Sequence, residues 1–258
     1  MNRMTRRRVI TTGLATAAGV SGLAVAERIA NRYGLIPPDH QGILGAGESL
    51  TYAAQRILTS RHSRAREFSR SEISRVAPVL GDPPVIEAYL RLVPGGFTDW
   101  RLTVDGLVSR PSSVSLAELK RFPVHSQITH QACEEGWSFI AEWIGVQLSF
   151  VLDVVGTLPQ AKYVVFTPYE NDNPPNVWWE SIDMADALHP QTLLAYGMNG
   201  SDLPIPHGAP LRLKVPRQLG YKNTKYLHRV TVTDSVAKIG KGLGGSFSED
   251  GYSWYAGI

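Results

Sequence analysis

The ten residues Thr129–Ser138, with the sequence THQACEEGWS, contain Cys133, the only cysteine of the 258-residue chain. A lone thiol cannot form an intramolecular disulfide, so it is free, buried or bound to a ligand. The preceding residues Val124–Thr129 predict a short strand, and Gly136 gives the backbone room to turn in the polar loop that follows. A thiol on such a loop favours a nucleophile or a metal ligand, whereas the usual burial of free cysteines favours a plain core residue. Taken alone, the stretch leaves these interpretations open.

Around this stretch the sequence predicts short strands mixed with short helices. Ser115 and Glu118 form a capping box that starts a helix, and Asn199-Gly200 is a turn after a strand. Strands are expected at Trp100–Val104, Val124–Thr129, Tyr163–Phe166, Leu193–Met198, Leu211–Val215 and Tyr226–Thr233, and helices after Ser115, from a Ser149 cap through Val155 to Gly156, and from Ser181 to the residue before Pro190. The sequence has no regular βαβ alternation, glycine-rich dinucleotide fingerprint or phosphate-loop motif. This pattern predicts an α+β fold with a mixed β-sheet.

The N-terminus has the three regions of a twin-arginine export signal. Arg6–Arg8 precede the mild apolar stretch Val9–Ala26, which ends in the small-x-small pattern Ala24-Val25-Ala26. We therefore expect residues 1–26 to be a signal, and the mature protein to be periplasmic or otherwise extracytoplasmic. An uncleaved signal acting as a membrane anchor stays open, because 18 residues are near the lower limit for spanning a bilayer. The alternative is a chance basic start on a cytosolic protein.

The charge balance gives no support for nucleic-acid binding. The whole chain carries 26 basic and 23 acidic residues, a formal net charge of +3. Residues 1–26 hold four of the arginines and no acidic residue, which leaves 22 basic against 23 acidic residues, a net charge of −1. A basic run from Arg56 to Arg75 predicts a solvated arm or surface helix, with contact to an anionic membrane as the alternative. Residues 27–75 as a whole lack strong periodicity and predict an extended N-terminal arm.

A second informative stretch runs from Asn199 to Tyr226. Arg212 offers a planar fork of hydrogen-bond donors to an anion. After Gly220, the loop Lys222–Lys225 is dense in ammonium, amide and hydroxyl groups, which can bind a phosphate. The same residues are compatible with an ordinary lysine-bearing turn, since charge clusters usually lie on solvated faces.

Five motifs, taken in order, carry a family resemblance. They are Cys-x-x-Gly-Trp-Ser at 133–138, Trp-Ile-Gly-Val at 143–146, Ala-Tyr-Gly-Met-Asn-Gly at 195–200, His-Gly-Ala-Pro-Leu-Arg at 207–212 and Gly-Tyr-Lys-Asn-Thr-Lys at 220–225. The chain resembles the sulfite oxidase family of molybdopterin-dependent oxidoreductases, in particular its bacterial exported branch, which includes the protein-methionine-sulfoxide reductase catalytic subunit. The resemblance covers roughly residues 66–258. It implies that residues 76–258 form a molybdopterin-binding oxidoreductase domain with the sulfite-oxidase-type fold.

The resemblance also implies the cofactor, Mo-molybdopterin, and a role for each matching residue. Cys133 would be the catalytic residue and the single protein thiolate on molybdenum, a soft ligand suited to a metal held by the dithiolene of a pterin. His207 and Arg212 would contact the pterin and its phosphate. The remaining implied cofactor contacts are Asn223, Thr224 and Lys225 at the phosphate end, and Thr167 after the strand Tyr163–Phe166.

Departures from the family pattern bear on cofactor and substrate. Leu80 stands where the family usually has an asparagine that contacts the pterin, and His130 is displaced by one from the position where members often place a basic residue. The basic residues that bind sulfite have no clear match, and Glu134, Glu135 and Glu142 cluster near the cysteine. Because an acidic neighbourhood would repel a sulfite dianion, we expect a neutral substrate.

Aromatic residues flank a polar loop near the expected mouth of the site. Tyr169, Trp178 and Trp179 lie on either side of the loop 171–176. They would line an apolar entrance for a neutral substrate such as a thioether sulfoxide, or they would serve core and lid packing, where most tryptophan surface goes.

The implied function is oxygen-atom transfer at molybdenum, in which a neutral S-oxide or N-oxide is reduced. This substrate would be a small molecule or a group on a protein. Since no second redox group is recognised in the sequence, electrons are expected from a partner, a membrane haem protein or a cytochrome. Sulfite-type oxidation by the same centre is one alternative. A cofactor-free exported binding module is another, supported by Leu80 and the displaced His130. A thiol hydrolase or transferase would pair Cys133 with His130 or His207, and a zinc site lacks the usual ligand spacing.

Overall fold

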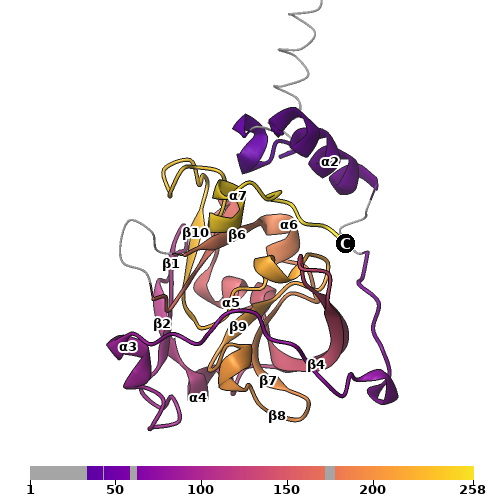
Figure 1. The fold of residues 1–258 in the computed structure, drawn as a ribbon. Coiled ribbons are helices and arrows are strands. Elements are labelled where there is room, and N and C mark those ends of the chain that lie inside the picture. The colour runs from indigo at the N-terminus through magenta and orange to yellow at the C-terminus, as the bar shows by residue number, and fades with distance from the viewer. Residues whose placement is uncertain (1–33, 43, 59–62, 172–177) are drawn as a thin grey trace, which may run out of the picture.

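The computed structural model describes residues 34–42, 44–58, 63–171 and 178–258 (Figure 1). The expected signal, residues 1–26, lies outside the described residues. Among the helices of the described ranges, none is both long and apolar enough to cross a bilayer.

The described chain forms two five-stranded sheets. The first has the order β2 (Ser112–Ser115), β1 (Arg101–Gly106), β10 (Leu227–Thr233), β5 (Tyr163–Pro168) and β6 (Glu180–Asp183). Strands β1 and β10 are parallel and the other neighbours are antiparallel. The second, wholly antiparallel sheet has the order β3 (Val124–Ala132), β4 (Ser138–Gln147), β7 (Leu193–Met198) and β8 (Ser201–Asp202), with β9 (Arg212–Lys214) on β7. The predicted α+β class and mixed sheet are confirmed.

The helices are short and connect or cover the sheets. They are α2 (Gly45–Leu58), α3 (Glu87–Leu90), α4 (Leu116–Leu119), α5 (Leu148–Val155), α6 (Met184–Ala187) and α7 (Ser246–Glu249). Single 3-10 turns are η1 (Pro38–Gln41), η2 (Arg70–Glu72), η3 (Ile205–His207) and η4 (Gly220–Lys222).

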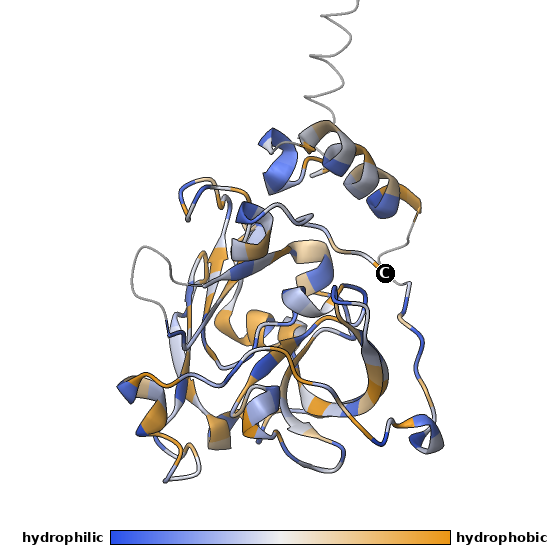
Figure 2. Ribbon diagram, viewed as in Figure 1, coloured by the Kyte–Doolittle hydropathy of each residue, from blue (hydrophilic) through white to orange (hydrophobic). Residues whose placement is uncertain are grey.

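The main core lies between the two sheets around α5. Leu102 and Val164 from the first sheet, Leu194 from the second, and Leu152 from α5 belong to one buried apolar cluster. Figure 2 shows apolar residues concentrated on α5 and the strands around it. Burying each such side chain contributes about 1.5–3 kcal/mol, so the cluster holds the two sheets together and fixes the loops at their ends.

Local signals predicted some element boundaries and missed others. The Ser115–Glu118 capping box is present, and Gly156 ends α5 in the left-handed conformation with φ +70°. The predicted Ser149 cap is wrong, because α5 begins at Leu148 and has no side-chain cap. The predicted helix start at Ser181 is also wrong. Residues Glu180–Asp183 form the buried strand β6 on β5, and Asp183 then caps α6 by accepting from the Asp186 N–H.

The N-terminal arm is not extended throughout, since it contains the 14-residue helix α2. Tyr52 packs edge-on against Trp254, and its hydroxyl donates to Asp183 at 2.6 Å. Arg56 bridges Asp183 and Asp186 at 2.6 and 2.8 Å. These contacts, made to residues more than a hundred positions away, hold α2 on the body of the protein.

Candidate active site

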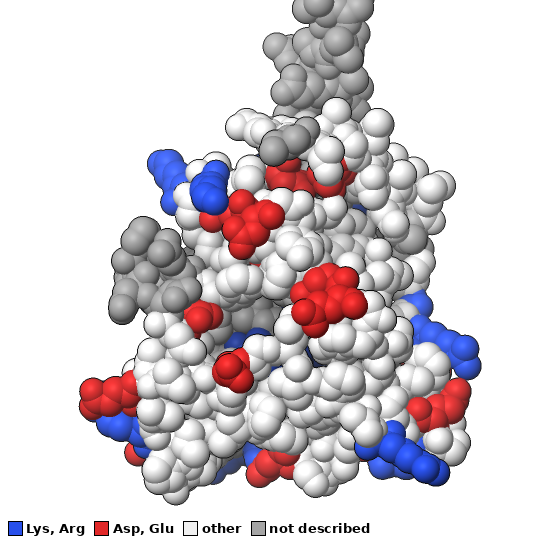
Figure 3. Space-filling view, viewed as in Figure 1, with Lys and Arg blue, Asp and Glu red and all other residues white. Residues whose placement is uncertain are grey.

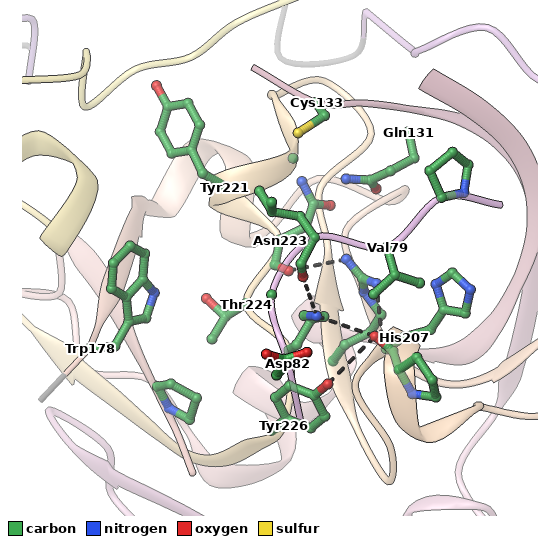
Figure 4. Close-up of a pocket in the computed structure, with 18 of the residues that line it drawn as sticks. Val79, Asp82, Gln131, Cys133, Trp178, His207, Tyr221, Asn223, Thr224 and Tyr226 are labelled. Atoms are coloured by element: carbon green, nitrogen blue, oxygen red, sulfur yellow. Dashed lines mark hydrogen bonds between the residues drawn. The ribbon is translucent and has the colours of Figure 1, made fainter. Parts of the chain in front are cut away.

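A cavity of about 450 Å³ opens beside the end of β3. Its walls come from the segment 78–84, the turn after β3, the η3–β9 segment and the residues from Gly220 to Tyr226 (Figure 4). Figure 3 shows a hollow in this face with basic side chains in its depth and carboxylates around it. Six of the seven residues predicted from the sequence line this one cavity: Cys133, His207, Arg212, Asn223, Thr224 and Lys225.

Thr167 is the seventh predicted residue, and the structure does not place it in the cavity wall. It lies within β5 opposite Arg229 of β10, whereas the next residue, Pro168, lines the cavity. Both residues belong to β5, and adjacent strand residues face opposite sides of a sheet. Because Pro168 faces the cavity, the Thr167 side chain faces away from it.

The turn after β3 presents Cys133 to the cavity. The Cys133 N–H donates to the Trp137 carbonyl at 2.9 Å, and Gly136, with φ +90°, donates to the Cys133 carbonyl at 3.1 Å. Sγ lies 3.4 Å from Glu134 Oε2. Burial, together with the charge of Glu134, raises the pKa of the Cys133 thiol to about 11. A thiolate is stable here only beside a cation, which favours a metal ligand over a free nucleophile.

The histidines that a thiol hydrolase would need do not support that alternative. In the described part of the chain, no hydrogen bond joins Cys133 to His130 or His207, and His130 does not line the cavity. Burial, with Arg212 next in effect, lowers the pKa of His207 to about 4. No group of three His, Cys, Asp or Glu side chains able to hold a metal occurs in the described ranges. The protein therefore offers a metal one thiolate, and the remaining ligands would belong to the cofactor.

The opposite wall holds two cations, Arg212 and Lys225, that form no ion pair among the described residues, although the charge of Asp82 acts on Lys225. Arg212 is buried, and its guanidinium donates to the carbonyls of His207 at 2.8 Å and Asn223 at 3.2 Å. Lys225 Nζ donates to the carbonyls of Leu80 at 2.7 Å and Pro206 at 3.2 Å. Burial lowers the pKa of Arg212 to about 10 and that of Lys225 to about 8. Two buried or half-buried cations whose hydrogen bonds go only to carbonyls form a site for an anion.

The loop after η4 divides its side chains between scaffold and cavity. Asn223 is used by the scaffold: its amide donates to the Leu219 carbonyl at 2.9 Å and accepts from the Val215 N–H at 2.7 Å. Lys222 is also structural, since Nζ pairs with Glu180 at 2.6 Å and both side chains are fully buried. Thr224 differs, because its buried Oγ1 has no partner among the described residues. An enclosed, unsatisfied hydroxyl on a residue that lines the cavity fits a ligand with acceptor oxygens.

The carboxylates that cluster in the sequence separate in the structure. Glu134 lines the cavity, Glu135 accepts from the Trp137 indole at 2.9 Å, and Glu142 is buried on β4, where it accepts from Arg70 at 2.7 Å. Asp82 and Glu170, which the sequence did not single out, complete the acidic lining. The acidic rim of the cavity therefore consists of Asp82, Glu134 and Glu170, and only Glu134 belongs to the cluster predicted from the sequence.

The aromatic residues also divide between two roles. Tyr169 and Trp178 line the cavity, and Trp178 packs edge-on against Phe247 at 4.6 Å. Trp179 is a core residue, packed with Val165 and Val236. Of the polar loop between them, residues 172–177 lie outside the described residues. Leu80, at the family's asparagine position, lines the cavity and offers its carbonyl to Lys225.

Comparison with known proteins matches the chain to a family model and to many similar proteins, among them one curated relative and one solved structure. Residues 91–239 match the sequence model of the family described as the oxidoreductase molybdopterin binding domain. The putative protein-methionine-sulfoxide reductase subunit YedZ1 of Azospira oryzae is 41% identical over 158 residues, which are 61% of this chain and 56% of that protein. The chain thus spans just over half the length of this relative. The sulfane dehydrogenase SoxCD of Paracoccus pantotrophus is 26% identical, with a TM-score of 0.49 over 54% of this chain and 39% of that one.

Proposed function

Because the chain belongs to the family of oxidoreductase molybdopterin binding domains, we propose that it reduces neutral S-oxides or N-oxides by oxygen-atom transfer. The family match confirms three predictions: the family itself, the molybdopterin cofactor and the class of oxidoreductases. The substrate, its direction of turnover and the residue roles are the proposal. Its main support is that one cavity is lined by a lone cysteine, by two cations without an ion pair among the described residues, and by a threonine whose hydroxyl has no partner there.

These residues would bind different parts of the cofactor. Cys133 would bind the metal, and Arg212, Lys225 and Thr224 would bind the phosphate end. His207, kept neutral by its low pKa, would donate or accept one hydrogen bond with the pterin. When bound, molybdopterin supplies a metal that exchanges an oxygen atom and two electrons with the substrate. In the balanced reaction, one sulfoxide takes up two protons and two electrons and gives one thioether and one water.

The acidic rim supports a neutral substrate. Asp82, Glu134 and Glu170 line the cavity, and Glu134 lies beside the thiol. A sulfite dianion approaching the metal would pass these carboxylates, whereas a sulfoxide carries no net charge. The name of the Azospira relative, a putative methionine-sulfoxide reductase subunit, favours S-oxides among neutral oxides. Sulfite-type oxidation stays the alternative. A cofactor-free binding module would leave Arg212, Lys225 and the unpartnered hydroxyl of Thr224 without a role.

Partner and location belong to the same proposal. Each turnover uses two electrons, and the molybdenum centre must be reduced again before the next one. These electrons would come from a membrane haem protein or a cytochrome. The arginines and apolar stretch in residues 1–26 support export by the twin-arginine route and work in the periplasm, with a retained signal as the alternative that anchors the protein.

The test compares sulfite with a neutral sulfoxide on one molybdenum-loaded preparation. We expect reduction of dimethyl sulfoxide with an artificial donor and little sulfite oxidation. Glu134→Gln should raise kcat/KM for sulfite about tenfold, because the Glu134 carboxylate lies 3.4 Å from the Cys133 sulfur and removing one charge at this range changes the interaction with an anion by roughly 1–4 kcal/mol. Glu135→Gln makes the same change outside the cavity wall and should have little effect. A kcat/KM for sulfite above that for every sulfoxide tried would refute the proposal.

A further inference from the structure

A buried lysine lies directly behind the cavity wall next to the thiol. Lys214 on β9 is 1% exposed, and its Nζ donates to the Gln131 side-chain oxygen at 2.7 Å and to the His130 carbonyl at 2.9 Å. Gln131, two residues before Cys133, lines the cavity (Figure 4). The lysine itself does not line it, so Gln131 separates the amine from any ligand.

These bonds fix the orientation of the Gln131 amide. Oε1 is the atom that accepts from Lys214, so Nε2 is the end left for the cavity. A lysine amine has at least two N–H donors in either protonation state, and its two acceptors here need two. The orientation therefore does not depend on the titration of Lys214. Within the described residues Nε2 has no acceptor, and it is not among their fully enclosed unpartnered atoms.

The free amide donor and the cysteine border the same space. A methyl group built on Gly220 would lie 3.0 Å from Gln131 Nε2, 3.1 Å from the Ala132 carbonyl oxygen and 3.5 Å from the Cys133 Cα, so Gly220 packs closely against this stretch. Gly220, Gln131 and Cys133 all line the cavity. A small ligand group in contact with the amide would thus lie next to the residue expected to hold the metal.

Lys214 is held in place without a carboxylate. Its Nζ lies 5.3 Å from the centre of the Trp143 ring, and the Arg212 guanidinium lies 4.8 Å from the same ring. Contact with this ring and two carbonyl-type acceptors keep the amine at this position. The amine in turn polarises the Gln131 amide toward the cavity, which makes Nε2 a stronger donor than a solvated glutamine.

We propose that Gln131 binds the oxygen of the substrate, with Lys214 as its positioning residue. This inference rests on the proposed function. The ligand class is a neutral molecule with one strongly polarised oxo acceptor, an S-oxide or N-oxide. The reduced product lacks that oxygen, so the amide distinguishes substrate from product and favours release of the thioether.

Gln131→Leu tests the subsite by comparing the two ligands. In the molybdenum-loaded enzyme, KM for dimethyl sulfoxide should rise about tenfold, which corresponds to about 1.4 kcal/mol, within the range of one hydrogen bond. The inhibition constant for dimethyl sulfide should change less than twofold, because the sulfide makes no bond to the amide. Gln131→Glu keeps the acceptor for Lys214 but offers no donor, so it should give the same result if the leucine variant folds poorly.

The matched control is Gln127→Leu. Gln127 is a buried glutamine on the same strand, its amide donates to the Gln191 carbonyl at 2.8 Å, and it does not line the cavity. This variant reports the cost of disturbing β3 and should leave both constants unchanged. Lys214→Met should raise KM for the sulfoxide severalfold alone, but should add nothing in the Gln131→Leu background, because Lys214 acts through the amide.

Two results would overturn the inference while leaving the proposed function standing. Equal weakening of sulfoxide and sulfide in Gln131→Leu would show a general loss of cavity shape. A lower molybdopterin content per chain in Gln131→Leu than in Gln127→Leu would place the amide on the cofactor instead. By contrast, a fully loaded wild-type enzyme that reduces no sulfoxide or N-oxide would refute the proposed function itself.

Discussion

Thr224→Val should have opposite effects on the cofactor-free and the cofactor-loaded protein. Thr224 is 5% exposed, and its Oγ1 has no partner among the described residues. A buried hydroxyl without a partner costs about 1–3 kcal/mol. Valine has nearly the same shape without the hydroxyl, so the cofactor-free variant should be more stable by about that amount, or about 2–4 °C in Tm per kcal/mol. With cofactor, the variant loses a bond to an anionic oxygen worth about 1.5–3 kcal/mol, which weakens retention by about 10- to 150-fold.

The assay uses two preparations and one matched control. Protein from a host that cannot make molybdopterin gives Tm by circular dichroism, and protein from a molybdenum-replete host gives molybdenum per chain after dialysis. Thr129→Val is the control, since Thr129 Oγ1 is also buried without a described partner but does not line the cavity. It should raise Tm without changing molybdenum content. A Thr224→Val variant that is less stable without cofactor, or that retains as much molybdenum as the control, would refute this reasoning.

Two further predictions concern the cations of the same wall. The double variant Arg212→Ala/Lys225→Ala loses two charge-assisted bonds of about 1.5–3 kcal/mol each, and should be purified largely without molybdenum; wild-type molybdenum content would exclude this wall as the anchor. In the cofactor-free protein, the pKa of Lys225 is lowered from 10.5 to about 8, so the unfolded chain binds more protons between these values. The free energy of unfolding of the wild type, measured with urea, should therefore rise from pH 8 to pH 10 relative to that of Lys225→Met. Below pH 8 the pH profiles of the two proteins should be parallel. Parallel profiles over the whole range would show that Lys225 is solvated.

Short-range chemistry explains which parts of the fold were predictable. The Ser115 capping box, Gly156 and the strand Leu193–Met198 depend on residues within a few positions, and the structure contains all three. The strand β6 has a helix-like start at Ser181, but burial against β5 overrides it. Helix α2 was missed because its stability comes from Tyr52 and Arg56 meeting residues more than a hundred positions away.

The site shows the same division. Motif order predicted six residues that the structure brings into one cavity, and their cofactor contacts stay predictions. Thr167 differs from these six because adjacent strand residues face opposite sides of a sheet, and here Pro168 and not Thr167 lines the cavity. The pairing of Lys214 with Gln131 joins positions 83 residues apart, and no sequence pattern near either residue indicates it. Likewise, the sequence could not reveal that Glu142 points away from the cavity into a pair with Arg70.

Cys133→Ser tests the central claim most directly, that this thiol is the protein ligand of molybdenum. Serine keeps the size of the side chain and removes the sulfur, while Arg212, Lys225 and Thr224 remain to hold the other end of the cofactor. The measurement is the visible spectrum of the loaded variant, with pterin content and sulfoxide reduction on the same sample. We predict that the thiolate-to-molybdenum absorption and the activity disappear while pterin is retained. A Cys133→Ser enzyme with wild-type activity and an unchanged spectrum would contradict the assignment.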